Sequence, residues 1–356
     1  MTVLTIPSGI DAVTPRWLTA ALRSCDTVSD TAVVTDVRAE RIAEDTGFSS
    51  LLYRLQITGT AGLPPSLIVK LPAQSEARGA MDMLGGYQRE VSFYQSVAGR
   101  APLLTPRVYT ALIAGADFVL VLEDLADWVN ADHLAGLSMR QARAAIGQLA
   151  GLHAWSVTAA DADALETFPS LDTPVVRELL VAAFGIGWQI YRDKSAAAVP
   201  GLVARYAERF TEFAPQALAA LTERRMLLHG DIRADNMFFD GDVLKVVDFQ
   251  FASLGCGAAD LGYLVSQGLP VQTRRGHDEE LVRDYLAGLA AHGVTDYGFD
   301  EAWRHYRMAV AYLLLFPVLA LIGWDTMPQR SRDLCLTLTD RAVATIDDID
   351  AIGVFA

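Results

Sequence analysis

The chain has 356 residues, of which 52% are apolar and 20% are charged, and its formal net charge is −14. This length is sufficient for two domains with separate cores, and the composition excludes a disordered chain. The acidic balance argues against nucleic acid as a partner, because binding a phosphate backbone requires a basic face.

The cysteines and the N-terminal residues indicate a cytoplasmic protein. Cys25, Cys256 and Cys335 lie far apart, and no C-x-x-C pair occurs. This pattern is typical of a reducing cytosol and predicts no structural zinc. Residues 1–11 lack a charged start and a long apolar run, so we expect no signal peptide.

The first third of the chain predicts a sheet with helices. Apolar residues at helical spacing predict a helix over 11–24, and an apolar run predicts a strand over 33–41. Two further strands are expected over 106–113 and 118–122, with a turn at 115–117 between them.

The stretch 43–55 predicts a turn followed by an apolar strand. The turn contains Gly47, Ser49 and Ser50, whose backbone N–H groups and hydroxyls could approach a phosphate. The stretch does not match G-x-G-x-x-G, and an ordinary hairpin turn explains it equally well. Both interpretations, a nucleotide loop and a hairpin turn, stay open from these residues.

A lysine and a glutamate in the next two elements are a candidate ion pair. Residues 67–70 predict a strand ending in Lys70, and 87–98 predicts a helix whose apolar stripe includes Glu90. A carboxylate on an apolar stripe requires a partner, and Lys70 is the nearest candidate. The alternative is a lysine that ends a strand at the surface, which is common.

The composition changes from strand-like to helix-like at Glu123, Asp124 and Leu125. We place the domain boundaries there. The prediction is an N-terminal lobe over 1–122, a hinge over 123–127, and a C-terminal lobe over 128–356.

The C-terminal lobe is predicted to be mainly helical. Ser138 and Gln141 have the spacing of a capping box at the start of a helix, and His153 near its end is expected to be structural. The aromatic residues of the amphipathic region 161–222 are either pocket walls or core, because helical spacing fits both uses. They are Phe184, Trp188 and Tyr191.

Further helices are expected over 277–292, 300–324 and 331–348. The stretch 308–324 is apolar enough to resemble a membrane span, but it is short for one and contains Pro317. We therefore expect a core helix that is bent or broken at this proline and no membrane span.

The stretch 226–251 carries the most specific pattern in the chain. An apolar run at 226–228 predicts a short buried strand, and a polar loop follows it. Two more apolar runs, 237–239 and 243–247, are joined by Asp-Gly-Asp, which is a hairpin signal. The second run leads into Asp248.

Three residues of this stretch suit phosphoryl transfer. Asp231 and Asn236 are five positions apart in one loop, and Asp248 follows one hairpin later. In kinases, an aspartate with this spacing accepts the proton of the substrate hydroxyl, and the asparagine and second aspartate bind Mg²⁺. We expect the three side chains to meet. The alternative is a set of polar turn residues.

The runs HGDIRADNMFF and VVDFQFASLGCGAADLGYL resemble the aminoglycoside phosphotransferase and choline kinase-like family, and most of all its ecdysteroid-kinase-like branch. The resemblance covers most of the chain. It implies an α+β, protein-kinase-like two-lobe fold, with a small antiparallel-sheet lobe that includes one helix and a larger, mainly helical lobe. It also implies ATP as phosphate donor, with GTP not excluded, and Mg²⁺.

The resemblance also implies roles for individual residues. Asp231 would be the catalytic base, and Arg233 would steady the γ-phosphate or an anionic group of the acceptor, unless it forms only a surface salt bridge. Mg²⁺ would be bound by Asn236 and Asp248. The implied nucleotide-binding residues are Gly47, Ser49, Ser50, Lys70, Glu90, Glu123 and Leu125, the last two through the hinge backbone.

Departures from the protein kinases point to a small-molecule acceptor. Asp248 is followed by Phe-Gln instead of Phe-Gly, and only eleven residues separate it from Asp260, with no Ala-Pro-Glu. The segment that would dock a peptide is missing, so we expect no protein substrate. Asp260 is expected to begin a helix and to accept backbone hydrogen bonds from the catalytic loop.

The acceptor is therefore expected to carry a hydroxyl group, and an aminoglycoside, a choline-like molecule and a hydroxylated lipid or steroid-like compound stay open. Two other functions also stay open. One is a metal-dependent phosphoester hydrolase built on His229, Asp231, Asp235 and Asp248. The other is a catalytically silent nucleotide-binding protein.

Overall fold

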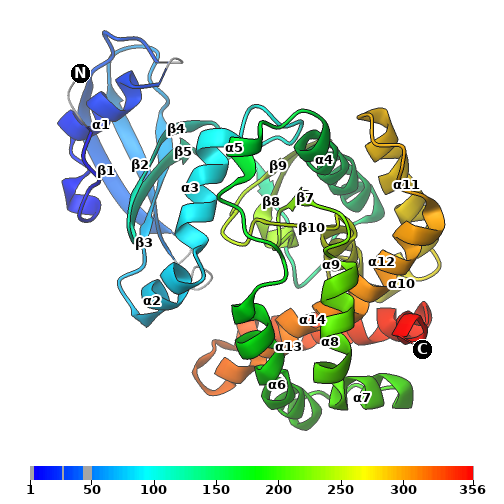
Figure 1. Cartoon of the computed structure of the whole chain (residues 1–356). Coiled ribbons are helices and arrows are strands. Elements are labelled where there is room, and N and C mark those ends of the chain that lie inside the picture. The colour runs from blue at the N-terminus through cyan, green and yellow to red at the C-terminus, as the bar shows by residue number, and fades with distance from the viewer. Residues whose placement is uncertain (1–3, 26–27, 43–49, 356) are drawn as a thin grey trace. The chain divides into compact units, whose positions relative to one another are not determined.

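A computed structural model describes residues 4–25, 28–42 and 50–355 (Figure 1). The chain forms two compact units, which we call the sheet unit and the helical unit. The sheet unit comprises Met1–Arg100, Leu104–Asp127 and Val247–Phe251. The helical unit comprises Ala101–Leu103, Trp128–Val246 and Ala252–Ala356.

The sheet unit is built on a five-stranded antiparallel sheet of order β1-β2-β3-β5-β4. Its strands are β1 (Val34–Ile42), β2 (Ser50–Gly59), β3 (Ser66–Pro72), β4 (Val108–Ala114) and β5 (Asp117–Glu123). Its helices are the short 3₁₀ turn η1 (Ile10–Ala12), α1 (Pro15–Arg23), α2 (Glu76–Met83) and α3 (Gly86–Ser96). The strands predicted from the apolar runs are confirmed, and α1 and α2 add to the one helix that the resemblance implied.

Side-chain alternation along β3 divides the two faces of the sheet. Leu67 and Val69 are buried in a cluster with Leu18 and Leu22 of α1. Successive side chains of a strand point to opposite faces, so Lys70 points away from that cluster. The apolar core therefore holds β3 in a register that directs its lysine to the other face.

The helical unit contains two small sheets among many helices. One sheet pairs β7 (Met226–Leu228) with β10 (Ser253–Gly255), and the other has the order β6-β8-β9. The strands of the second sheet are β6 (Val129–Asn130), β8 (Met237–Asp240) and β9 (Val243–Val246). The predicted hairpin is confirmed, and its turn includes Gly241 at φ 57°, where a side chain would be strained.

The helices of this unit are α4 (Met139–Thr158), α5 (Ala162–Leu165), η2 (Val176–Leu180), α6 (Val181–Lys194), α7 (Gly201–Glu208), α8 (Phe210–Ala220), η3 (Ala234–Asn236), α9 (Ala258–Gly268), α10 (Val271–Arg274), α11 (Asp278–Ala291), α12 (Phe299–Leu313), α13 (Leu315–Ala320), η4 (Leu321–Thr326), α14 (Gln329–Asp348) and η5 (Ala351–Phe355). The capping box that begins α4 is present: the Ser138 hydroxyl accepts from the Gln141 N–H, and the Gln141 side chain accepts from the Ser138 N–H. This reciprocal bonding satisfies N–H groups that have no partner inside the helix.

The aromatic residues of α6 belong to the core. The rings of Phe184 and Phe210 stack with centroids 3.9 Å apart, and Trp188 is buried beside Tyr191. The Tyr191 hydroxyl donates to the Asp340 carboxylate at 2.7 Å. These contacts decide between the two uses that the sequence left open, because the rings fill space between helices.

The apolar segment near the C-terminus is broken before its proline. α12 ends at Leu313 and α13 begins at Leu315, so Pro317 lies in the first turn of α13, where its missing N–H costs no helical hydrogen bond. Among the described residues, Phe299–Thr326 alone is long and apolar enough to span a membrane by composition, and 61% of its most apolar window is buried inside the protein.

Candidate active site

Lys70 and Glu90 form a buried ion pair in the sheet unit. The Lys70 Nζ lies 2.7 Å from Glu90 Oε1 of α3, and the two side chains are 7% and 1% exposed. Burial alone would lower the pKa of Lys70, but the carboxylates of Asp248 and Glu90 raise it overall, so the amine stays charged. Burial, together with the nearby charge of Asp248, raises the pKa of Glu90 to about 7, although the charge of Lys70 acts in the opposite direction.

Asp248 joins this pair within the sheet unit. Its Oδ1 lies 3.1 Å from the Lys70 Nζ, and its side chain is 31% exposed. The residue has φ 68°, a left-handed conformation that is rare outside glycine and concentrated at functional sites. Phe249 holds this backbone in place by stacking on Phe93 of α3, with ring centroids 3.5 Å apart.

Gln250 ties the same segment to β2. Its side-chain nitrogen donates to the Ser50 Oγ at 2.9 Å, and both residues are buried. The predicted nucleotide-contacting hydroxyl of Ser50 is thus engaged inside the sheet unit. Gly47 and Ser49, the other predicted members of that loop, lie outside the described residues.

In the helical unit, Asp231 and Asn236 are brought together by their own loop. The Asn236 Nδ2 donates to the backbone oxygen of Asp231 at 2.9 Å, and the Asn236 N–H donates to the Arg233 oxygen at 3.0 Å. The amide nitrogen is used for the loop, so the amide oxygen of Asn236 is the atom that suits a cation. Gly230 precedes Asp231 at φ 82°, a conformation that favours glycine.

Asp260 anchors this loop from the first turn of α9, as predicted. Its carboxylate accepts from the backbone N–H groups of His229 at 2.6 Å and Gly230 at 2.9 Å. The His153 Nε2 lies 3.1 Å from the same carboxylate, and the His153 Nδ1 lies 2.9 Å from the Tyr285 hydroxyl. His153 is therefore structural, as expected.

The contacts of the Asp260 carboxylate outweigh the effect of its burial on its pKa. Burial by itself would raise it, but the hydrogen bond and charge of His153, the charge of His229 and the Gly230 N–H lower it overall. The carboxylate is thus held ionised where an unpaired one would take up a proton.

The Asp231 side chain has one neighbour on each oxygen. The Tyr263 hydroxyl donates to Oδ1 at 3.3 Å, and the Arg233 Nε lies 3.2 Å from Oδ2. The Asp231 side chain is 19% exposed, so it is oriented without being enclosed. Tyr263 was not predicted, although it follows Asp260 by one helical turn, which places both on the same side of α9.

The hinge residues lie at the end of β5. The Glu123 carboxylate accepts from the Arg107 N–H at 2.9 Å, and Leu125 is buried. Of the predicted residues, Lys70, Glu90 and Asp248 lie together in the sheet unit, and Asp231, Arg233 and Asn236 share one loop of the helical unit. The meeting of Asp231, Asn236 and Asp248 at one cation stays a prediction.

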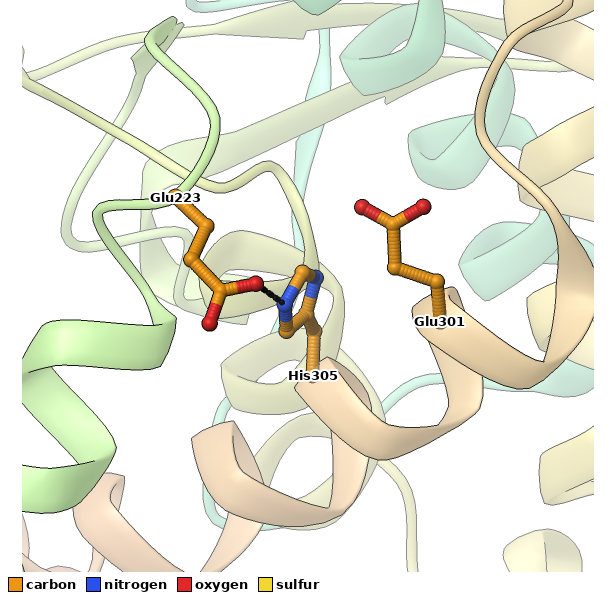
Figure 2. Close-up of side chains that lie close together, drawn as sticks. All are labelled: Glu223, Glu301 and His305. Carbon is orange, nitrogen blue, oxygen red and sulfur yellow. Dashed lines mark hydrogen bonds and ion pairs between the residues drawn. The ribbon is translucent and has the colours of Figure 1, made fainter.

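A second cluster of potential metal ligands lies elsewhere in the helical unit (Figure 2). Glu223, Glu301 and His305 each place one ligand atom within 4.8 Å of the others, and the His305 Nε2 lies 3.0 Å from the Glu223 carboxylate. Arginines already neutralise both carboxylates: Arg304 contacts Glu223 at 2.6 Å, and Arg224 contacts both oxygens of Glu301 at 2.8 and 3.1 Å. The cluster is therefore a salt-bridge network.

Solved structures show which fold this is. A choline/ethanolamine kinase family protein from Mesorhizobium loti is 17% identical, with a TM-score of 0.51 and coverage of 94% of this chain and 97% of that one. Aminoglycoside 2′-phosphotransferase-IIIa in its GDP complex is 15% identical, with a TM-score of 0.54 and coverage of 93% and 99%. Choline kinase from Cryptosporidium parvum Iowa II is 10% identical, with a TM-score of 0.51 and coverage of 96% and 95%. The fold is protein-kinase-like, with an N-terminal five-stranded antiparallel sheet followed by a mainly helical part.

The sequence itself shows the family. The search of curated proteins found no match to this chain. The model of the ecdysteroid kinase-like family, however, matches residues 45–294, which include Lys70, Glu90 and Asp248 as well as the loop with Asp231 and Asn236. This chain belongs to the ecdysteroid kinase-like family, a family of small-molecule kinases.

Proposed function

We propose that the protein transfers the γ-phosphoryl group of ATP to a hydroxyl group of a small organic molecule. The observation that carries this proposal is the buried pair of Lys70 and Glu90 with the Asp248 carboxylate 3.1 Å from the same amine. Burying the charges of Lys70 and Glu90 is costly, and binding of nucleotide phosphates would give this arrangement a function. GTP is a second candidate donor, because the solved aminoglycoside 2′-phosphotransferase-IIIa is a GDP complex.

In this proposal the sheet unit binds the nucleotide. Lys70 neutralises charge on the α- and β-phosphates, and Glu90 keeps the amine oriented. Gly47 and Ser49 are proposed to contact the phosphates, whereas the buried Ser50 hydroxyl, which accepts from Gln250, supports this end of β2. The backbone of Glu123 and Leu125 holds the base.

The donor atoms of Asn236 and Asp248 fit Mg²⁺. One offers an amide oxygen and the other a partly exposed carboxylate, and oxygen is the ligand that this hard cation prefers. Mg²⁺ would supply neutralisation of the phosphate charge when bound.

Asp231 orients the acceptor and takes its proton. The acceptor oxygen forms a bond to the γ-phosphorus, the bond from that phosphorus to the β–γ bridging oxygen breaks, and the nucleoside diphosphate leaves. The hydroxyl proton passes late to the Asp231 carboxylate, since the transition state is loose and needs little proton transfer early. Tyr263 and Arg233, one on each carboxylate oxygen, fix the direction in which Asp231 points.

The hydrolase alternative is less well supported by the contacts. His229 uses its Nδ1 to accept from the Asp231 N–H at 3.2 Å, and the Asp235 Oδ1 accepts from the His133 N–H at 3.0 Å. Two of the four residues proposed for that site, His229 and Asp235, thus accept backbone hydrogen bonds. A hydrolase would also give the buried Lys70 no role.

The Asp231→Asn variant tests the proposal. The experiment measures nucleoside diphosphate release with Mg²⁺-ATP or Mg²⁺-GTP and a panel containing kanamycin, choline and a polyhydroxylated steroid. With an accepted substrate, turnover of Asp231→Asn should fall at least about 100-fold. The rise in melting temperature caused by Mg²⁺-nucleotide should be unchanged, because a ligand that binds only the native state stabilises it.

Three outcomes would contradict the proposal. Full turnover by Asp231→Asn would remove the catalytic assignment. No rise in melting temperature with either nucleotide at millimolar concentration would remove nucleotide binding. Release of phosphate from p-nitrophenyl phosphate without nucleotide, lost on Asp231→Asn, would favour the hydrolase.

A further inference from the structure

A two-point ion pair lies at the hinge end of the sheet unit. Arg54 of β2 donates through Nε to Asp124 Oδ2 at 2.8 Å and through Nη2 to Oδ1 at 3.3 Å. Asp124 directly follows β5, and its side chain is 3% exposed, whereas that of Arg54 is 31% exposed. A planar guanidinium on both oxygens of a carboxylate fixes orientation as well as distance.

The pair crosses the face of the sheet that carries Lys70. Arg54 pairs with Ile68 of β3, and Ile68 pairs with Leu122 of β5. Directly opposed residues share a face, and so do residues two apart on one strand, so Arg54 and Lys70 lie on the same face. β3 lies between β2 and β5, so the Arg54 side chain spans β3 to reach Asp124.

The distance along β3 between Lys70 and the row of Arg54 places the ion pair on the side of Lys70 that leads to the hinge. Two residues along a strand cover about 7 Å, so the row of Arg54 and Ile68 lies that far from Lys70. β3 runs from Lys70 back to Leu67, which pairs with Glu123 at the start of the hinge. If Lys70 contacts the phosphates, the sugar and base extend along this row toward the hinge.

We infer that Arg54 is a positioning residue for the nucleotide base, an inference that rests on the proposed function. Through Asp124 it fixes the backbone of residues 123–125, whose N–H and C=O groups would bind the base edge. The Glu123 side chain is held separately by the Arg107 N–H, so the two acidic side chains of residues 123–125 are both engaged. The exposed part of the guanidinium lies beside the base and can stack on a purine ring of either kind.

A ligand without a base (tripolyphosphate) and a ligand without phosphates (adenosine) distinguish this role from phosphate binding. Arg54→Met should raise the KM for both ATP and GTP about tenfold while kcat changes less than about threefold, as expected when uniform binding is lost. Binding of adenosine should weaken by a similar factor. Binding of Mg²⁺-tripolyphosphate, which has no base, should stay unchanged, whereas Lys70→Met should weaken it.

Two further variants keep the test decisive. Arg38→Met is the matched control, because Arg38 lies on neighbouring β1 with its side chain 86% exposed. This variant should leave the binding of every ligand unchanged. Arg54→Lys keeps the charge without the two-point contact and should give an intermediate KM. If Arg54→Met does not fold, Arg54→Lys and Asp124→Asn carry the same comparison.

The outcomes distinguish this inference from the proposed function. If the wild type binds ATP and GTP but folded Arg54 variants keep wild-type KM values, the positioning role is wrong and the kinase proposal stands. If the Arg54 variants weakened the binding of tripolyphosphate as much as that of ATP, the positioning role would also be wrong. If the wild type binds neither nucleotide nor tripolyphosphate, both the inference and the proposed function fail.

Discussion

In the sheet unit, the Lys70 side chain is positioned by the charged side chains of Glu90 and Asp248. In the helical unit, Asp231 is positioned by its loop, whose backbone is hydrogen-bonded to Asp260. Glu90 and Asp248 each contact the Lys70 amine directly, and all three residues are proposed to serve the reaction. Asp260 accepts hydrogen bonds from two backbone N–H groups of the loop. Among the described residues, it forms no hydrogen bond with the Asp231 side chain. In the sheet unit, the side chains that hold Lys70 are therefore also proposed to take part in the reaction. In the helical unit, Asp260 holds the loop and a different residue, Asp231, is proposed to react.

This difference between the two units determines whether a mutation changes stability and activity together or separately. In the sheet unit, removing one charge leaves another buried without its partner, so stability and ligand binding change together. In the helical unit, Asp260, which supports the loop, and Asp231, the proposed catalytic group, can be altered one at a time.

The largest effect is expected for Lys70→Met. This change leaves Glu90 buried without a cation, and breaking a buried ion pair from one side costs about 3–5 kcal/mol of unfolding free energy. Mg²⁺-ATP should no longer raise the melting temperature. Denaturant unfolding with and without nucleotide measures both quantities.

The double variant Lys70→Met with Glu90→Leu is the control for that prediction. Replacing both members of a buried pair by apolar residues is often neutral, so most of the lost stability should return. Nucleotide binding should stay absent, because the amine is still missing. A single Lys70→Met variant as stable as the wild type would show that the pair is not buried as described.

A smaller loss is expected for Asp260→Asn. The carboxylate accepts two backbone N–H groups, and hydrogen bonds to charged groups contribute about 1.5–3 kcal/mol, so unfolding free energy should fall by about 2 kcal/mol or more at neutral pH. Turnover should fall too, since the loop that presents Asp231 loses its anchor. The affinity for nucleotide phosphates at Lys70 should change little.

The pH dependence of this variant has a definite sign. The pKa of Asp260 is lowered below its ordinary value of 3.8, so the folded protein gives up this proton more easily than the unfolded chain. The stability from the carboxylate is then fully present above the ordinary pKa and is lost as the pH falls through the lower, folded one. The difference between wild type and Asp260→Asn should shrink below about pH 4; a constant difference down to pH 3 would contradict the assignment.

Much of this fold could be predicted because its signals are local. The capping box of Ser138 and Gln141 lies within one helical turn, and the hairpin around Gly241 lies within ten residues. The pairing of Lys70 with Glu90 spans only 20 positions and follows from a charge on an apolar stripe. Asp260 was predicted to accept backbone hydrogen bonds, and the structure confirms it.

The rest depends on contacts between residues far apart in the chain. Asp248 follows two strands of the helical unit, but its partner Lys70 lies 178 positions earlier, and no local pattern encodes that separation. The aromatic residues of α6 have the same helical spacing whether they line a core or a pocket. The Arg54–Asp124 pair spans 70 positions, and its two residues are ordinary ones for a strand and a turn.

The smallest effect is expected for Tyr263→Phe, which removes one contact to the Asp231 side chain and leaves its backbone support intact. A phenylalanine can keep the edge contact of this ring with Phe316, whose centroid lies 5.8 Å away, so packing should be preserved. Losing a hydrogen bond of about 1 kcal/mol corresponds to about fivefold lower kcat with an accepted substrate, with nucleotide KM unchanged. A loss as large as that of Asp231→Asn would mean that the tyrosine touches the reacting atoms, and side-chain contacts would then matter as much in the helical unit as in the sheet unit. An unchanged kcat would mean that the backbone held by Asp260 is sufficient to direct Asp231.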